Sequence, residues 1–386
     1  MGGCNSLQAC LVGSELKLEI DTNRESYFCP KKHVLIFSHT IVVCSECHKR
    51  KRCHSCQKCN YNSCISESCR LLTLERFKSS LRQSKQIHTE NPTKHSTAEQ
   101  EEQKIINQSL KGHDGPLRSI IKISDTSVAT ASGDRTIIIW DLLGSKIIQR
   151  LKDHNDWVHS LVRFGERQFV SGSSDNLLKV WNINTYDCNS LKGNTHSVFC
   201  VVKINDSKIA SGSFKVIKIW DVPSHICLKT LEGHTDWVYA LVKIKDTLIA
   251  SGGVDKIIKV WDILTATCIS NLKGHLNYIN ALIRLDDNTI VSASVDKTIK
   301  VWDIKTSNCI KTLTDHSRSV NCLANLSDDK FASGSADKTI KIWNIASYTC
   351  TNSFEADDYS VNCIAKLSET QLVSGGKDKT LKVWNL

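Results

Sequence analysis

From about residue 102 to the end of the chain, apolar and polar residues alternate with a period near two. Turn signals such as "SGDRT" and "SADKT" interrupt this alternation at short intervals. A period of two places successive side chains on opposite faces of a β-strand, so the pattern predicts short antiparallel strands joined by tight turns. Each interrupted unit has room for four such strands.

The same unit recurs seven times, and a tryptophan marks each copy. The tryptophans stand at positions 140, 181, 220, 261, 302, 343 and 384. In most copies a histidine lies 27 residues upstream, a serine or threonine ten upstream and an aspartate six upstream. A four-stranded unit cannot bury both of its faces alone, whereas units arranged radially bury one another. The repeat therefore predicts a mainly β fold, a seven-bladed β-propeller over residues 102–386.

Two copies depart from the pattern. The last copy ends two residues after its tryptophan, and Lys104–Leu110, which repeats the outer-strand pattern, is predicted to supply its missing outer strand. Such a closure removes exposed sheet edges. The third copy has a shorter turn, no aspartate before Lys215, and Asn194 in place of the histidine. We expect the third blade to lack the recurring polar set and to be the most easily deformed.

These residues closely resemble the WD-repeat family, and the likeness covers roughly residues 102–386. The resemblance implies that each regular blade holds a hydrogen-bonded tetrad, which in the fourth blade consists of His234, Ser251, Asp255 and Trp261. Buried imidazole, carboxylate and indole groups each need a partner, and a fixed spacing supplies one. We therefore interpret the repeat histidines and aspartates as structural rather than catalytic.

The same resemblance implies that the start of the innermost strand, on the narrower face of the propeller, binds a partner protein or peptide. Aromatic and basic residues of two sequence columns gather there in the first five blades: Arg118, Trp157, His159, Phe199, Trp237, Tyr239 and Tyr278. Exposed Trp, Tyr and Arg are typical of interface hot spots. The alternative is that these rings pack beneath the loops.

A cysteine-rich segment at residues 25–70 precedes the propeller. Four close pairs of residues suit two tetrahedral zinc sites: Cys29 and His33, Cys44 and Cys47, Cys56 and Cys59, and Cys64 and Cys69. The segment resembles ZZ and related cross-brace zinc fingers, which implies that pairs one and three share one zinc ion and pairs two and four the other. His39, Cys53 and His54 are alternative ligands, and disulfide bonding is the alternative to zinc.

Eight further cysteines recur in two columns of the repeat, and we expect them to be small buried apolar residues. Residues 71–101 are predicted to form an amphipathic helix followed by a flexible linker.

Residues 1–24 form an N-terminal arm that begins "MGGCNS". This matches a myristoylation signal with Gly2 as the acceptor, and Cys4 is a candidate for palmitoylation; two acyl chains together would hold the arm at a membrane surface. No apolar run approaches the length of a membrane span. We expect a cytoplasmic protein with reduced thiols, membrane-associated through the acylated arm.

The formal net charge is +10, and residues 1–95 carry 15 Lys and Arg against 8 Asp and Glu. Zinc-bound thiolates would reduce this excess. The basic run Lys49–Arg52 is not interleaved with aromatic residues, so the sequence does not favour nucleic-acid binding.

The sequence contains no phosphate-binding glycine loop, nucleophile elbow or catalytic cysteine context, and we expect no small-molecule substrate. The leading interpretation is a protein-protein interaction scaffold that binds a partner on the propeller face and uses the zinc module for a second contact. The alternative is a substrate-recruiting ubiquitin ligase of the RING or TRAF-type WD-repeat kind, although Cys53–Cys56 lacks the RING spacing.

Overall fold

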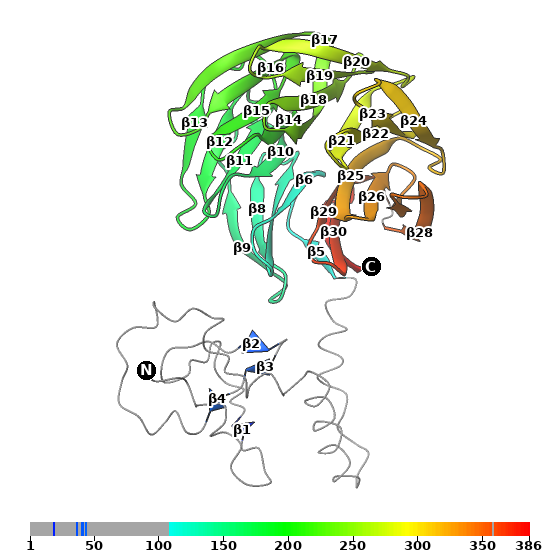
Figure 1. Cartoon of the computed structure of the whole chain (residues 1–386). Coiled ribbons are helices and arrows are strands. Elements are labelled where there is room, and N and C mark those ends of the chain that lie inside the picture. Colours follow the sequence, from blue (N-terminus) through cyan, green and yellow to red (C-terminus); the bar gives the residue numbers. More distant parts are fainter. Residues whose placement is uncertain (1–17, 20–35, 38–39, 42, 45–107, 357–358) are drawn as a thin grey trace, which may run out of the picture. The chain divides into compact units, whose positions relative to one another are not determined.

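The computed structural model describes residues 108–356 and 359–386, together with residues 18–19, 36–37, 40–41 and 43–44. The chain forms two compact units, Met1–Lys94 and His95–Leu386. The second unit contains the repeats, and its strands form a ring of blades (Figure 1).

Four blades are separate four-stranded antiparallel sheets whose strands follow the sequence from the centre of the ring outward. The first has β6 (Leu117–Lys122), β7 (Ser127–Ser132), β8 (Ile137–Asp141) and β9 (Lys146–Leu151). The second has β10 (Val158–Arg163), β11 (Gln168–Ser173), β12 (Leu178–Asn182) and β13 (Cys188–Leu191). The fifth has β21 (Ile279–Arg284), β22 (Thr289–Ser294), β23 (Ile299–Asp303) and β24 (Asn308–Leu313). The sixth has β25 (Val320–Ser327), β26 (Lys330–Ser335), β27 (Thr339–Asn344) and β28 (Thr349–Glu355).

The third and fourth blades form one continuous seven-stranded sheet, which differs from the separate blades expected. Its strands are β14 (Cys200–Lys203), β15 (Lys208–Gly212), β16 (Phe214–Asp221), β17 (Ile226–Lys245), β18 (Leu248–Gly253), β19 (Ile257–Asp262) and β20 (Thr267–Lys273). The long β17 is both the outer strand of the third blade and the inner strand of the fourth. The shortened turn of the third copy explains this continuity, because β16 begins at Phe214, which pairs with Trp237 of β17.

The seventh blade closes the ring. Its strands are β29 (Val361–Lys366), β30 (Gln371–Gly376), β31 (Thr380–Asn385) and, on the outside, β5 (Ser109–Lys111). Leu110 pairs with Leu381, and the amide of Val383 donates a hydrogen bond to the carbonyl of Gln108 at 3.1 Å. The predicted closing strand is thus confirmed over Ser109–Lys111, while residues 104–107 lie outside the described residues.

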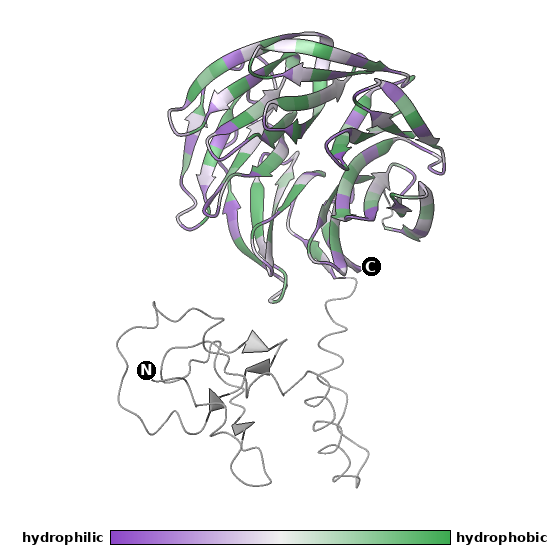
Figure 2. Ribbon diagram, viewed as in Figure 1, coloured by the Kyte–Doolittle hydropathy of each residue, from purple (hydrophilic) through white to green (hydrophobic). Residues whose placement is uncertain are grey.

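The apolar core lies mainly between neighbouring blades. Trp140 of the first blade belongs to the same buried cluster as Leu110, Leu381 and Val383 of the seventh. Apolar bands run through the inner strands, as Figure 2 shows. Each blade therefore depends on both of its neighbours, which is the physical reason that the repeat closes into a ring.

The prediction for the repeat cysteines is confirmed in one column and wrong in the other. Cys200, Cys322 and Cys363 on inner strands are buried. The column at the start of the outer strands is half-buried or exposed: Cys188, Cys227, Cys268, Cys309 and Cys350. Outer strands have a neighbouring strand on one side only, so the second column remains accessible to solvent.

The described strands of the first unit form two short antiparallel pairs. β1 (Leu18–Glu19) pairs with β4 (Val43–Cys44), and β2 (Ile36–Phe37) pairs with β3 (Thr40–Ile41). Of the predicted zinc ligands, Cys44 lies in β4 and the other seven lie outside the described residues, as do Gly2, Cys4 and the predicted helix.

Among the residues that the structure describes, no helix is long and apolar enough to cross a membrane. No group of three or more His, Cys, Asp and Glu side chains in that part of the chain is placed to hold a metal ion. The zinc sites stay a prediction, because almost all of their residues lie elsewhere.

Candidate partner-binding site at the channel mouth

Polar tetrads account for the repeat histidines in five blades. In the fourth blade, Trp261 Nε1 donates to Ser251 Oγ at 2.7 Å, and Ser251 Oγ lies 2.6 Å from His234 Nε2. His234 Nδ1 lies 2.6 Å from Asp255 Oδ2. Burial alone would raise the pKa of Asp255, but the hydrogen bond and charge of His234, together with the backbone N–H groups of Ile257 and Thr235, lower the pKa below its usual value. Equivalent histidine–aspartate pairs occupy four other blades, at His113, His154, His275 and His316.

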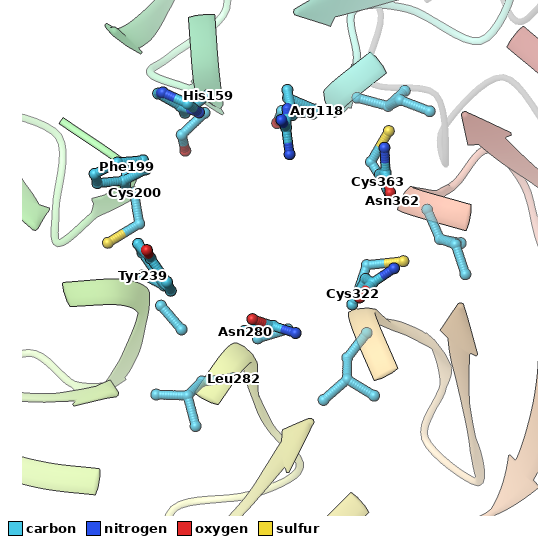
Figure 3. Close-up of a pocket in the computed structure, with 18 of the residues that line it drawn as sticks. Arg118, His159, Phe199, Cys200, Tyr239, Asn280, Leu282, Cys322, Asn362 and Cys363 are labelled. Carbon is cyan, nitrogen blue, oxygen red and sulfur yellow. The ribbon is translucent and has the colours of Figure 1, made fainter. Parts of the chain in front are cut away.

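A β-bulge recurs near the start of the innermost strands. In the second blade Val158 pairs with Ser173 and Ser160 with Gly172, so that His159 has no residue opposite it. A bulge of this kind redirects the extra side chain. The same register shift occurs at Arg118, Tyr239, Asn280, Asn321 and Asn362. These six residues and Phe199 of the third blade line one central cavity of about 820 Å³ (Figure 3).

The fifth to seventh blades contribute asparagines to this ring, and these asparagines join neighbouring blades. The Nδ2 of Asn280 donates to the carbonyl of Val320 at 3.0 Å, and that of Asn321 donates to the carbonyl of Val361 at 2.9 Å. Asn362 donates to the carbonyl of Leu117 in the first blade at 3.1 Å. On this side of the cavity, therefore, each of the three asparagine amides donates to the neighbouring blade.

The second to fourth blades contribute a connected series of rings. The ring of Trp157 lies 6.2 Å from that of His159, which lies 4.5 Å from Phe199. Phe199 lies 5.1 Å from Trp237 and 4.9 Å from Tyr239, edge to face in both cases. His159, Phe199 and Tyr239 follow one another along one side of the cavity in Figure 3.

The Trp, Phe and Tyr residues predicted to bind a partner fall into two groups by exposure. Trp157 and Tyr278 are exposed, at 42% and 41% of their surface. Phe199, Trp237 and Tyr239 are half-buried and pack against other rings, which is in part the packing that we considered as the alternative. Trp157 lines the cavity, whereas Tyr278 does not, and Tyr278 contacts none of the connected rings among the described residues.

Two aromatic residues at this site were not anticipated. Phe214 lies 4.9 Å from Trp237, and His196 lies 5.2 Å from Phe214. The shortened turn of the third blade places Phe214 where other blades continue their turn toward an aspartate. The departure from the repeat was visible in the sequence, but its consequence for Trp237 depends on the pairing of β16 with β17.

Arg118 is the cation of the site. Its guanidinium carbon lies 4.9 Å from the centroid of Trp157, and its Nε is buried without a hydrogen-bond partner among the described residues. Burial lowers the pKa of Arg118 from its usual value. In Figure 3, Arg118 lies on the ring between His159 and Asn362.

His159, the neighbour of Arg118, is a neutral group at pH 7. Burial, and then the positive charge of Arg118, lower the pKa of His159 to about 4. Its Nε2 lies 2.7 Å from Ser174 Oγ, so the ring is held in place by the turn after β11.

The ring of four-stranded blades with a central cavity defines a β-propeller. Comparison with known families then identifies its repeats: the model described as WD domain, G-beta repeat matches residues 105–141, 145–182 and 348–385, and the WDR41 β-propeller model matches residues 222–354. None of the four matched ranges includes residues 183–221, where the irregular third blade lies. A search of curated proteins found no match.

WD repeats and a WDR41-type propeller domain are thus present in this chain, and propellers of this class generally serve as scaffolds for protein-protein interaction. The cross-brace zinc finger and the ubiquitin-ligase alternative rest on residues 25–70, nearly all outside the described residues, and stay predictions.

Proposed function

We propose that this protein is an interaction scaffold that binds a partner protein or peptide across the mouth of the propeller cavity, over the rings of Trp157, Phe199 and Trp237. The observation that carries the proposal is the connected series of aromatic rings, exposed at Trp157, on one side of the cavity. Rigid aromatic side chains at the edge of a cavity supply large contact areas at little conformational cost.

The test is capture of interacting proteins by the full chain and by a variant with Trp157→Ala and Trp237→Ala. We expect the variant to lose its partners, because each truncated aromatic anchor typically costs about 2 kcal/mol or more of binding energy. The control carries Leu143→Ala and Leu264→Ala, which remove exposed apolar side chains from turns at the opposite end of the blades. Captured proteins that are unchanged by the tryptophan substitutions, in a variant that keeps its fold, would refute this site.

We further propose that residues 25–70 bind two zinc ions and provide a second contact. The paired ligand spacing supports this proposal. Elemental analysis of the full chain should give two zinc ions per chain, and Cys56→Ser and Cys64→Ser should each lose one. All nine tryptophans lie between residues 140 and 384, so tryptophan fluorescence after chelation monitors the propeller alone. Absence of zinc from the purified chain would overturn the proposal.

The N-terminal arm is proposed to place the scaffold at a membrane surface through acylation of Gly2 and Cys4. The sequence "MGGCNS" supports this proposal. Mass spectrometry of the protein from its own cells should show the added acyl masses, and an unmodified or acetylated N-terminus would contradict it.

A further inference from the structure

Arg118 is an uncompensated charge in the cavity. Among the described residues that line the cavity, Arg118 is the one formally charged side chain, and none is a carboxylate. Its two ionisable neighbours do not supply a negative charge. Burial raises the pKa of Tyr239 above its usual value, and burial raises that of Cys363 well above its usual value, so both are neutral at pH 7.

Two acidic residues act on the neighbours of Arg118, Asp156 on His159 and Asp236 on Tyr239, and each accepts a backbone hydrogen bond. Asp156 Oδ1 accepts the backbone N–H of Trp157 at 2.7 Å, and Asp236 Oδ1 accepts that of Trp237 at 2.8 Å. Arg118 has no ion-pair partner within the described part of the chain. A half-buried cation with an unpartnered buried N–H loses hydration without regaining an acceptor, which costs folding energy unless a ligand provides the acceptor.

The geometry around Arg118 indicates which kind of acceptor its guanidinium binds. The guanidinium carbon lies over the Trp157 ring, and along the edge of the guanidinium the buried Nε–H has no hydrogen-bond partner among the described residues. A carboxylate meets such an edge with two parallel hydrogen bonds. Phosphate groups, which carry nearly two negative charges, are usually bound by clusters of arginines. Here one cation is present, and the asparagine amides across the cavity already donate to backbone carbonyls.

We propose that the channel mouth recognises an acidic peptide segment of a partner protein, in which an Asp or Glu carboxylate binds Arg118 and an adjacent apolar side chain packs on the aromatic rings of Trp157 and Phe199. This inference rests on the proposed function and specifies the chemistry of the bound partner.

The surrounding surface has the complementary charge. Five blades carry a cation at the same position of the turn between their second and third strands, and in the third blade Lys215 stands at the start of β16: the six are Arg135, Lys215, Lys256, Lys297, Lys338 and Lys379. All six are exposed and none has an ion-pair partner among the described residues. Backbone hydrogen bonds connect these turns to the loops at the channel mouth; for example, Val254 and Val295 donate to the carbonyls of Trp237 and Tyr278. An acidic segment that reaches Arg118 therefore passes these unpaired positive side chains.

The experiment is selection of random displayed peptides on the immobilised full chain, followed by affinity measurement with synthetic copies of the selected peptides. We expect the selected sequences to share an Asp or Glu beside an aromatic or aliphatic residue. Arg118→Gln should weaken binding about tenfold to a hundredfold, because a bidentate hydrogen bond to a charged group is lost. Arg118→Lys should be intermediate, since lysine keeps the charge but not the fork of donors.

The matched control is Arg318→Gln, which removes an exposed arginine from the loop leading into the sixth blade, on the same face, and changes the net charge equally. Replacing the peptide's acidic residue by its amide should weaken binding as much as Arg118→Gln does, and combining the two changes should cost little more. A selected sequence without an acidic residue, equal losses with Arg318→Gln, or a phosphoserine peptide that binds through Arg118 much more tightly than the carboxylate peptide would overturn the inference.

The outcomes also separate this inference from the proposed function. If selected peptides lose affinity with Trp157→Ala but not with Arg118→Gln, the mouth binds peptides and the acidic specificity is wrong. If no peptide is selected, or binding survives both substitutions, the channel mouth is not the binding site and both proposals fail.

Discussion

At the scale of single residues, the histidine position of the tetrad shows how one side chain can change the stability of a blade. In the fourth blade His234 has partners on both ring nitrogens, Asp255 and Ser251. In the third blade Asn194 occupies this position, and its Oδ1 and Nδ2 are both buried without partners among the described residues. A buried amide without hydrogen bonds is unfavourable, so the same position stabilises one blade and weakens the next.

We therefore predict opposite effects for one substitution at these two positions. Asn194→Leu should raise the free energy of unfolding by about 1 kcal/mol, because two unsatisfied polar atoms are removed. His234→Leu should lower it by about 2–4 kcal/mol, because Asp255 and Ser251 lose their partner in a buried setting. Urea unfolding followed by tryptophan fluorescence measures both. Equal destabilisation by the two substitutions would contradict this account of the third blade.

His159 makes the stability of the propeller sensitive to mild acid. Its pKa is about 4 in the folded chain, below the usual value of 6.5, because of burial and the charge of Arg118; the nearby carboxylate of Asp156 acts in the opposite direction. As the pH falls from about 6.5 to 4, the unfolded chain binds a proton at this position and the folded chain does not, so stability decreases. Above pH 6.5 this contribution is constant.

We expect His159→Gln, which can keep a hydrogen bond to Ser174, to reduce the loss of stability between pH 6.5 and 4 by about 1–3 kcal/mol. Urea unfolding at several pH values gives the difference from the unmodified chain. Part of the pH dependence should persist, because burial also lowers the pKa of His316. The tetrad aspartates, such as Asp255, have lowered pKa values and lose their contribution at lower pH, below about 4. Identical pH profiles for the two proteins would show that His159 does not titrate in this way.

At the scale of strands, the propeller depends on a very short closing element. β5 has three residues, and Leu110 is its buried one, packed with Trp140 and Leu381 between the first and seventh blades. Ser109 and Lys111 are exposed on either side. Without this strand, the backbone of β31 presents a free edge that can pair with another chain.

Leu110→Asp should lower the free energy of unfolding by at least about 3 kcal/mol and promote association at higher protein concentration, because it places a charge between two blades and releases β31. Ser109→Asp is the control, since the same side chain at an exposed position should change stability by about 0.5 kcal/mol or less. Urea unfolding and light scattering are the measurements. If the two variants behave alike, β5 does not hold the ring closed.

The elements also show what the sequence could and could not predict. The repeated pattern was sufficient for the blades and the closing strand, because each follows from a local pattern repeated in register, and the resemblance to WD repeats supplied the tetrad of His234. The joining of the third and fourth blades was missed, since it depends on how β16 pairs with β17. The role of Asn280, Asn321 and Asn362 was also missed, because their acceptors are carbonyls of the next blade, 40 residues away for the first two and 245 residues away for Asn362.

At the scale of the whole propeller, the two ends of the blades differ in how their charges are balanced. At the hairpins between first and second strands, cations pair with acids three residues on: Lys122 with Asp125, Lys203 with Asp206, Lys243 with Asp246, Arg284 with Asp287, and Lys366 with Glu369. At the opposite end, around the channel mouth, the six exposed cations named above, from Arg135 to Lys379, have no ion-pair partner among the described residues. The positive potential should therefore be strongest on the face that contains Arg118.

This arrangement predicts that association at the channel mouth depends on ionic strength. For the acidic peptides proposed to bind Arg118, the association rate constant should fall as salt is raised, because the unpaired cations attract the peptide before contact. Lys256→Gln with Lys297→Gln should lower that rate a few-fold at low salt and leave the dissociation rate nearly unchanged, since these side chains steer the peptide without anchoring it. Lys146→Gln with Lys305→Gln makes the same change of charge at the opposite end and should have little effect. Surface plasmon resonance over a series of salt concentrations measures both rates. A salt-independent association rate, or equal effects of the two pairs, would show that the charge of this face does not guide the partner.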